Sequence, residues 1–192
     1  MKRTLKFTAL AIAMALAMVG CGCAAPTPRP SPSWKQVQSA RIPSLCGHKP
    51  TKLVKGKHTG ILPGRGMFEL SPTLYSGKSG VITNVASSGG PLTAVVANCN
   101  QGGVSWPHEI LFFGPGAKFV ASTDLYEGRW DAIGLYGPAR NGVQSLTRTS
   151  AGLSIDVMAS RPSDASCCPS ARASVNLKVS GGKVVITSIK RR

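Results

Sequence analysis

The chain has 192 residues, with 23 basic residues, 7 acidic residues and a formal net charge of +16. A field this positive favours anionic partners such as phospholipid headgroups, charged wall polymers or acidic proteins. The shortage of carboxylates leaves little material for general acid and base chemistry.

The N-terminus has the pattern of an export signal. Basic residues precede an apolar run from Phe7 to Gly20, which suits a signal peptide and is too short to span a bilayer comfortably. The run ends in Met-Val-Gly-Cys, which resembles a bacterial lipobox with Cys21 as the residue that becomes diacylated. Residues 1–20 are therefore the expected lipoprotein signal peptide. Cleavage after Ala25 with simple secretion, or an uncleaved anchor, are the alternatives.

A proline-rich tether follows at residues 21–33, where alternating prolines predict an extended, solvated segment. Residues 34–192 form the expected single domain. Loss of residues 1–20 removes three basic residues and no acid, so 20 basic residues face 7 acidic ones, a formal +13. We expect a domain held by a lipid anchor at the extracytoplasmic face of the plasma membrane, where nucleic acid is not an expected partner.

The coarse pattern of the domain is strands joined by Gly and Pro turns. A short helix is expected from Ser33 to Ala40, with Ser33 as its N-cap. Apolar or alternating runs of strand length come next. They lie at Val81–Ala86, Leu92–Asn98, Glu109–Phe113, Lys118–Ser122, Ala132–Tyr136 and Val143–Arg148.

The last strands carry the clearest signal. In residues 152–159 apolar side chains alternate with mixed ones, and Gly181-Gly182 lies where a two-residue hairpin needs positive φ. The turn predicts a register that keeps one face apolar, pairing Ser180 with Lys183, Val179 with Val184 and Leu177 with Ile186. We expect a mainly β fold: a single antiparallel β-sheet or sandwich domain of about eight strands with a short N-terminal helix, stapled by disulfides.

Four cysteines fall in the folded part: Cys46, Cys99, Cys167 and Cys168. Export makes disulfides the default expectation. A bond between Cys167 and Cys168 would be strained, and in extended backbone adjacent side chains point to opposite faces. We therefore expect Cys167 and Cys168 each to bond one of Cys46 and Cys99, in either order.

Metal and redox chemistry are weaker alternatives for the same cysteines. A zinc site would combine Cys46 and His48 with the double cysteine and His58 or His108, but the spacing matches no known zinc pattern. A redox dithiol needs a C-x-x-C motif at a helix N-terminus, which is missing here. We predict neither a metal nor a cofactor.

The lipobox, the tether and the run Cys167-Cys168-Pro169-Ser170 before the strand at 173–179 resemble the LppP/LprE family of actinobacterial envelope lipoproteins. The segments ARIPSLCGHKPTKLVKG and CNQGGVSWPHEILFF resemble stretches of related exported proteins. The resemblance implies a cell-envelope lipoprotein without an established activity, and no catalytic residue carries over.

Enzyme chemistry finds little support in the pattern. Ser105, His108 and Glu109 supply hydrolase residue types, yet one local trio does not make a triad. Asp124, Glu127 and Asp131 fall in a stretch with Arg129 and are interpreted as a solvated loop rather than a carboxylate pair for sugar hydrolysis. No catalytic residue is predicted, and an extracytoplasmic hydrolase is the least favoured function.

Aromatic residues in the loops are the candidate binding residues: Trp106, Tyr126, Trp130 and Tyr136. Such rings can stack on sugars or on a partner protein, or fill the core at strand ends. We expect a non-enzymatic binding or scaffold module for an anionic wall or lipid component. The alternative is an adaptor or inhibitor that binds a partner protein of the envelope.

Overall fold

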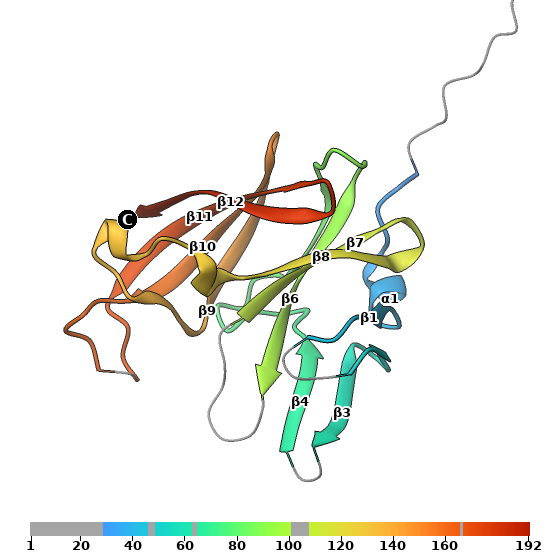
Figure 1. Ribbon diagram of the computed structural model, residues 1–192, viewed down its shortest axis with the longest axis horizontal. Helices are drawn as coiled ribbons and strands as arrows, with labels where there is room; N and C mark the ends of the chain where they lie inside the picture. The colour runs from blue at the N-terminus through green and yellow to red at the C-terminus, as the bar shows by residue number, and fades with distance from the viewer. Residues whose placement is uncertain (1–28, 46–48, 63–64, 101–107, 166) are drawn as a thin grey trace, which may run out of the picture.

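The computed structural model describes residues 29–45, 49–62, 65–100, 108–165 and 167–192 (Figure 1). The expected signal peptide, Cys21, Cys46 and Trp106 lie outside these residues. The described chain is mainly β and antiparallel, as the sequence predicts. Within it, no helix combines the length and the apolar character needed to cross a membrane.

One sheet of the described chain has six strands in the order β3-β4-β6-β7-β8, with β5 paired beside β4 along β6. The strands are β3 (Lys57–Leu62), β4 (Arg65–Leu70), β5 (Val81–Val85), β6 (Leu92–Asn100), β7 (His108–Gly114) and β8 (Lys118–Asp124). A second sheet has four strands in the order β12-β11-β10-β9. These are β9 (Gly137–Thr149), β10 (Gly152–Ser160), β11 (Ala171–Ser180) and β12 (Lys183–Arg191).

The two sheets share a hydrophobic core. One face of β6 and β7 contributes residues such as Val96, Ile110 and Phe112, and the four-stranded sheet contributes Ile155 and Val175, all fully buried. Alternation along β10 and β11 sends the intervening polar side chains to the outer face of that sheet. The domain is therefore a β-sandwich in which the outer face of the four-stranded sheet meets solvent.

The other face of the six-stranded sheet is covered as well. Helix α1 (Trp34–Val37), β1 (Arg41–Ile42) and the segment around β2 (Thr51–Lys52) place Val37, Ile42 and Leu53 over this face. Strands β6 and β7 are consequently buried on both sides, and this explains their nearly continuous apolar sequence.

Residues 31–33, the end of the expected tether, are attached to the domain. The carbonyl oxygen of Pro32 accepts a hydrogen bond from the hydroxyl of Thr93, and the hydroxyl of Ser31 lies 3.0 Å from Oδ1 of Asn84. Ser33 then caps α1 in a capping box with Gln36. Residues 31–33 thus pack on the domain, and the predicted helix is present but shorter than expected.

Most predicted strands are confirmed, and the hairpin register is that expected from the sequence. Ser180 pairs with Lys183, Val179 with Val184 and Leu177 with Ile186 across Gly181 and Gly182, which have φ of 58° and 72°. The structure adds β1 to β4, which sequence reasoning missed. Strands β3 and β4 escaped notice because their sequences, KHTGIL and RGMFEL, mix glycine and charge without clear alternation.

The strand predicted at Ala132–Tyr136 is wrong. The chain instead forms two short 3₁₀ turns, η2 (Leu125–Glu127) and η3 (Asp131–Ile133), and a further such turn, η1 (Pro115–Ala117), precedes β8. Gly134 ends η3 with a left-handed φ of 72°, and the backbone N–H of Leu135 returns to the carbonyl of Trp130. Leu135 is buried, and its backbone N–H is satisfied by this local hydrogen bond rather than by pairing with a neighbouring strand.

Candidate anion-binding site

A small pocket gathers basic side chains beside the outer face of the four-stranded sheet. Its volume is about 190 Å³. Residues from the loop at 71–80, from β9, β10 and β11 and from the residue after β12 line it. They are Ser76, Lys78, Gln144, Ser145, Asp156, Val157, Arg172, Ala173 and Arg192.

The strand register places the polar centre of this pocket. Ile155 and Val157 face the core, so Asp156 between them faces outward. Asp156 pairs across strands with Ser145 on β9, whose hydroxyl donates a 2.9 Å hydrogen bond to Oδ2. The other carboxylate oxygen receives Arg192, whose guanidinium nitrogen lies 2.9 Å away. The single acid of the pocket is therefore already matched by one cation.

The remaining two cations of the pocket, Lys78 and Arg172, are not neutralised. Neither lies within 4.0 Å of a carboxylate of any residue in the described ranges. Lys78 is brought to the sheet because the hydroxyl of Ser76 donates a 2.6 Å hydrogen bond to the carbonyl oxygen of Gln144 on β9. Arg172 is the second residue of β11, and its carbonyl oxygen accepts the backbone N–H of Arg192.

The side-chain charges of the pocket sum to about +2, from three cations and one acid. Two cations that line one pocket and have no carboxylate within 4.0 Å among the described residues attract an anion, and a guanidinium offers paired donors that match phosphate or carboxylate. At about 190 Å³ the pocket is smaller than the ~300–1,000 Å³ typical of drug-sized ligands. The pocket can hold one phosphate or carboxylate group together with a small part of the molecule to which that group is attached.

The rest of the basic surface is also weakly neutralised. Among cations whose side chains are described, three lie within 4.0 Å of a carboxylate: Lys57, Arg129 and Arg192. The formal net charge of the chain, +16, is therefore not cancelled by these pairs, and it adds a long-range attraction for anions to the local one.

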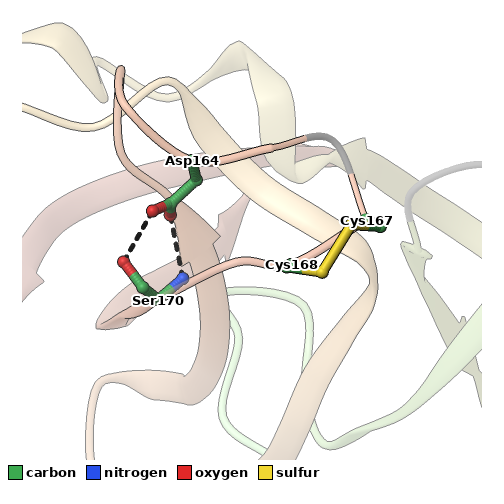
Figure 2. The surroundings of a disulfide bond; sticks show 4 residues. All are labelled: Asp164, Cys167, Cys168 and Ser170. Carbon is green, nitrogen blue, oxygen red and sulfur yellow. Dashed lines mark hydrogen bonds between the residues drawn. A yellow bond between two sulfur atoms is a disulfide. The ribbon is translucent and has the colours of Figure 1, made fainter.

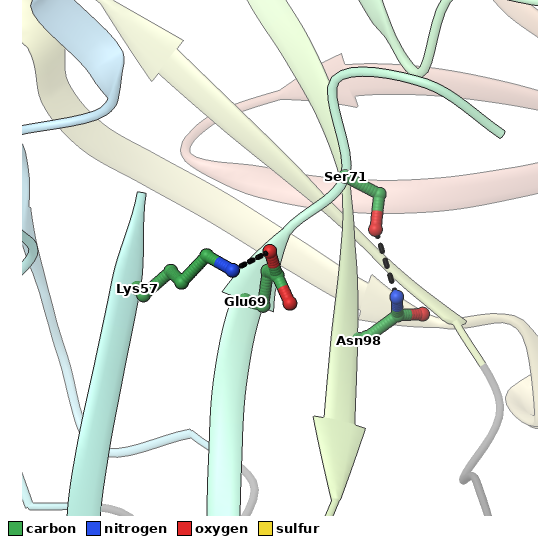
Figure 3. Close-up of polar contacts among 4 residues, drawn as sticks. All are labelled: Lys57, Glu69, Ser71 and Asn98. Atoms are coloured by element: carbon green, nitrogen blue, oxygen red, sulfur yellow. Dashed lines mark hydrogen bonds and ion pairs between the residues drawn. The ribbon is translucent and has the colours of Figure 1, made fainter. Parts of the chain in front are cut away.

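A second polar group, on β3, β4 and β6, is self-compensating (Figure 3). Lys57 Nζ lies 2.6 Å from Oε1 of Glu69, and Nδ2 of Asn98 donates a 2.8 Å hydrogen bond to the hydroxyl of Ser71. One cation and one acid leave no net charge for a ligand to recognise. A wider groove of 650 Å³ beside α1 and β1 holds Arg41 and Lys118 over an apolar floor that includes Ile42 and Phe119.

The aromatic residues proposed for binding differ in exposure within the described chain. Trp130 is 2% exposed and its indole Nε1 donates to the carbonyl oxygen of Leu125, so it is a core residue and the binding role predicted for it is wrong. Tyr126 and Tyr136 are 46% and 69% exposed, but neither lines the cationic pocket. Trp106 lies outside the described residues.

The residues considered for a hydrolase point apart. His108 faces the core between the sheets, where its Nδ1 accepts the backbone N–H of Val143, and burial lowers the pKa of His108 to about 4. Glu109 follows it in the strand and faces the opposite side, with Oε1 3.7 Å from Sγ of Cys99. Burial first, and then the charges of Asp124 and Glu127, raise the pKa of Glu109 to about 7. These two side chains cannot form one triad, and Ser105 lies outside the described residues.

The predicted cross-pairing of Cys167 and Cys168 is contradicted, because the two are bonded to each other (Figure 2). The prediction assumed extended backbone, which would turn the two side chains to opposite faces. The chain instead bends here, and the N–H of Cys168 donates to the carbonyl of Ala165. Cys99 is also disulfide-bonded, and neither Cys167 nor Cys168 is its partner. The predicted candidate, Cys46, lies outside the described residues.

Asp164 organises the loop that carries the Cys167–Cys168 bond. Its carboxylate accepts hydrogen bonds from the backbone N–H of Ser170 at 2.8 Å and from the Ser170 hydroxyl at 2.7 Å (Figure 2). It also accepts the backbone N–H of Arg161 at 2.8 Å. The backbone hydrogen bond from Arg161, followed by those from Ser170, lowers the pKa of Asp164. The loop is thereby closed at both ends by one side chain.

Within the described ranges, no group of three or more His, Cys, Asp or Glu side chains is placed to hold a metal ion. No family model, curated protein or solved structure matches the chain significantly. Function has to be inferred from the residues themselves.

Proposed function

We propose that the protein is a lipid-anchored component of the cell envelope whose β domain binds an anionic group of the wall or of the lipid surface, without catalysing a reaction. The observation that carries the proposal is the convergence of Lys78 and Arg172, free of acidic partners among the described residues, on a pocket that also holds Arg192. Phosphate and carboxylate groups are the ligands for which such a set of donors is suited.

The pocket offers orientation as well as charge. Arg172 can engage an oxyanion through two parallel N–H groups, while Lys78, from the loop at 71–80, contributes a mobile point charge. Asp156 holds Arg192 at 2.9 Å and lowers the net charge of the site. We therefore expect a ligand of moderate affinity whose binding weakens as salt is added, because exposed charges are screened at physiological ionic strength.

A lipid anchor would place this pocket near its ligands. With Cys21 acylated, residues 21–30 would connect the membrane to Ser31, the first residue of the described chain that a hydrogen bond joins to the domain. An extended proline-rich segment spans about 3.1 Å per residue, so these ten residues would reach roughly 30 Å. This length is enough for the domain to meet lipid headgroups or the inner part of the wall.

Sedimentation with purified cell-wall fragments tests the proposal on the whole chain in a non-ionic detergent. We expect the wild type to sediment at low salt and to be released at high salt. The Lys78→Gln/Arg172→Gln variant should be released at lower salt than the Lys35→Gln/Lys52→Gln control, which loses the same charge at exposed positions outside the pocket.

Mixed micelles that contain phosphatidylglycerol then distinguish the two sources of anion. If they displace the protein from the wall fragments, the lipid headgroup is the stronger ligand, whereas retention favours a wall polymer. A chain that fails to sediment and also ignores the anionic micelles would overturn the proposal.

A further inference from the structure

The Cys167–Cys168 disulfide has no role as a cross-link between distant segments. It joins neighbouring residues, whose Cα atoms are 3.8 Å apart, in the loop between β10 and β11. A disulfide stabilises a fold chiefly by closing a long loop of the unfolded chain, and this one encloses no intervening residue. Both cysteines are exposed rather than packed in the core.

The fold around this bond is secured by other contacts. Asp164 ties Arg161 to Ser170 through three hydrogen bonds, so the loop ends stay together whether or not the sulfurs are joined. Beyond them β10 and β11 pair directly, with Ala159 opposite Ala171. Opening the disulfide should therefore leave the sheet and its core in place.

Cys99 provides an internal comparison. It is also disulfide-bonded, but it is 5% exposed and packs in the cluster beneath α1 with Phe68 and Ala97. Exchange requires a thiolate to approach one sulfur of the bond, so access decides which bond reacts first. Adjacent cysteines also lie closer than the usual 4.4–6.8 Å between the Cα atoms of bonded cysteines, a geometry that favours reduction.

We propose that Cys167–Cys168 is a thiol-exchange site, opened by low-molecular-weight thiols while the rest of the protein stays folded. The thiolate of a small thiol attacks one sulfur, the Cys167–Cys168 bond breaks, and the second cysteine leaves as a thiolate that takes a proton from water. A second thiol attacks the small-molecule sulfur of the mixed disulfide and releases the first cysteine. Two electrons pass to the protein, and the two thiols leave as their own disulfide.

The reduced form displays two neighbouring thiols on an exposed loop. Such a pair of thiols can bind a trivalent arsenic compound. A monosubstituted arsenic(III) oxide would condense with both thiols, forming two As–S bonds and releasing one water. This site is independent of the anion pocket, so it does not rest on the proposed function.

Graded reduction tests the proposal on the whole chain. The protein is treated with increasing dithiothreitol, free thiols are alkylated with iodoacetamide, and tryptic peptides are weighed. One tryptic peptide, bounded by Arg148 and Arg172, holds both cysteines, because trypsin does not cut between Arg161 and Pro162. We expect this peptide to carry two alkyl groups once the Cys167–Cys168 bond is reduced. The dithiothreitol concentration needed for this should be at least about tenfold lower than the concentration that reduces the disulfide of Cys99.

The far-ultraviolet circular dichroism and the melting temperature should be unchanged when this first bond has opened. Equal or later reactivity compared with Cys99, labelling before any reductant is added, or loss of the fold on opening would each overturn the proposal. As a second measurement, the reduced protein should gain one phenylarsine group from phenylarsine oxide. The Cys167→Ser/Cys168→Ser variant should gain none, and a reduced wild type that takes up none would contradict the dithiol part.

Discussion

The indole Nε1–H of Trp130 donates a 2.8 Å hydrogen bond to the carbonyl oxygen of Leu125, and both side chains are buried between the sheets. The bond connects η2 to the start of η3 and fixes the bend between them. Gly128, inside that bend, is closely packed, since a Cβ atom there would lie 2.3 Å from Cδ1 of Ile189 and 2.9 Å from Nε1 of Trp130, so these side chains would have to shift. Trp130, one of the four loop aromatics considered for binding, is therefore a structural residue of the core.

The Trp130→Phe variant should destabilise the domain by about 1–3 kcal/mol, because it removes the donor and leaves a void in the core. Urea denaturation measures this. Tyr136→Phe is the matched control, and since Tyr136 is 69% exposed its effect should stay within about 0.5 kcal/mol. Equal stability of the two variants would show that the Trp130 contact contributes little.

The sequence pattern predicted secondary structure correctly where residues close together in the chain determine it. The Gly181-Gly182 turn and the alternation around Leu177 predicted the last hairpin in its register, because both partners lie within one short segment. The segment from 132 to 136 was not predictable in the same way. Its apolar residues resemble a strand, and it is the contact of Trp130 with Leu125, together with left-handed Gly134, that selects turns.

The raised pKa of Glu109 should make the stability of the domain depend on pH. Its ordinary pKa of 4.5 is raised to about 7 by burial and by Asp124 and Glu127. Between these pH values the folded state keeps a proton that the unfolded state has released, so this group makes stability fall as pH rises. His108, whose lowered pKa makes stability rise with pH over nearly the same window, opposes it.

Glu109→Gln removes the first of these two contributions and leaves the second. The stability of the variant relative to wild type should therefore increase from pH 4.5 to pH 7.5, by at most about 3 kcal/mol. Thermal unfolding at the two pH values measures it. The exposed Asp131→Asn variant should show no comparable change, and a pH-independent difference for Glu109→Gln would contradict the assigned burial.

The anion pocket could not be predicted, since its residues are contributed by positions from Ser76 to Arg192. Basic residues that are scattered in the sequence, such as Lys78 and Arg172, converge only because the loop at 71–80 reaches β9 through the bond from Ser76 to Gln144. The sequence does predict that a ligand of the proposed site would be negatively charged, because the formal net charge of the chain is +16. The disulfide pattern failed because a local turn at Ala165 replaced the assumed extended backbone.

Lipidation predicts a defined mature N-terminus. Mass spectrometry of the protein from the membrane fraction should find Cys21 as the first residue, carrying acyl chains, because the preceding run ends in the lipobox-like Met-Val-Gly. The Cys21→Ser variant should lose the acyl mass and leave the membrane fraction. A mature chain that begins at Pro26 would contradict lipidation and would indicate simple secretion.

Replacing Asp156 should strengthen the binding of an anion to the pocket rather than weaken it. Its carboxylate is the one acid of the pocket and holds Arg192. Asp156→Asn keeps the shape, removes the negative charge and frees Arg192, so the affinity for an anion should rise by about threefold to tenfold, equivalent to roughly 1 kcal/mol at a half-exposed site. Fluorescence or calorimetric titration with glycerol phosphate measures the change, and weaker binding would mean that Asp156 itself contacts the ligand.

The most direct test of the pocket is calorimetric titration of glycerol phosphate into the whole chain and two variants of equal charge. We predict that Lys78→Gln/Arg172→Gln lowers the affinity at least about tenfold, because two charge-assisted contacts are lost. Lys35→Gln/Lys52→Gln, which removes two exposed cations elsewhere, should change it less than about twofold. Equal losses in the two variants would show that diffuse charge, and not the pocket formed by Lys78, Arg172 and Arg192, attracts the anion.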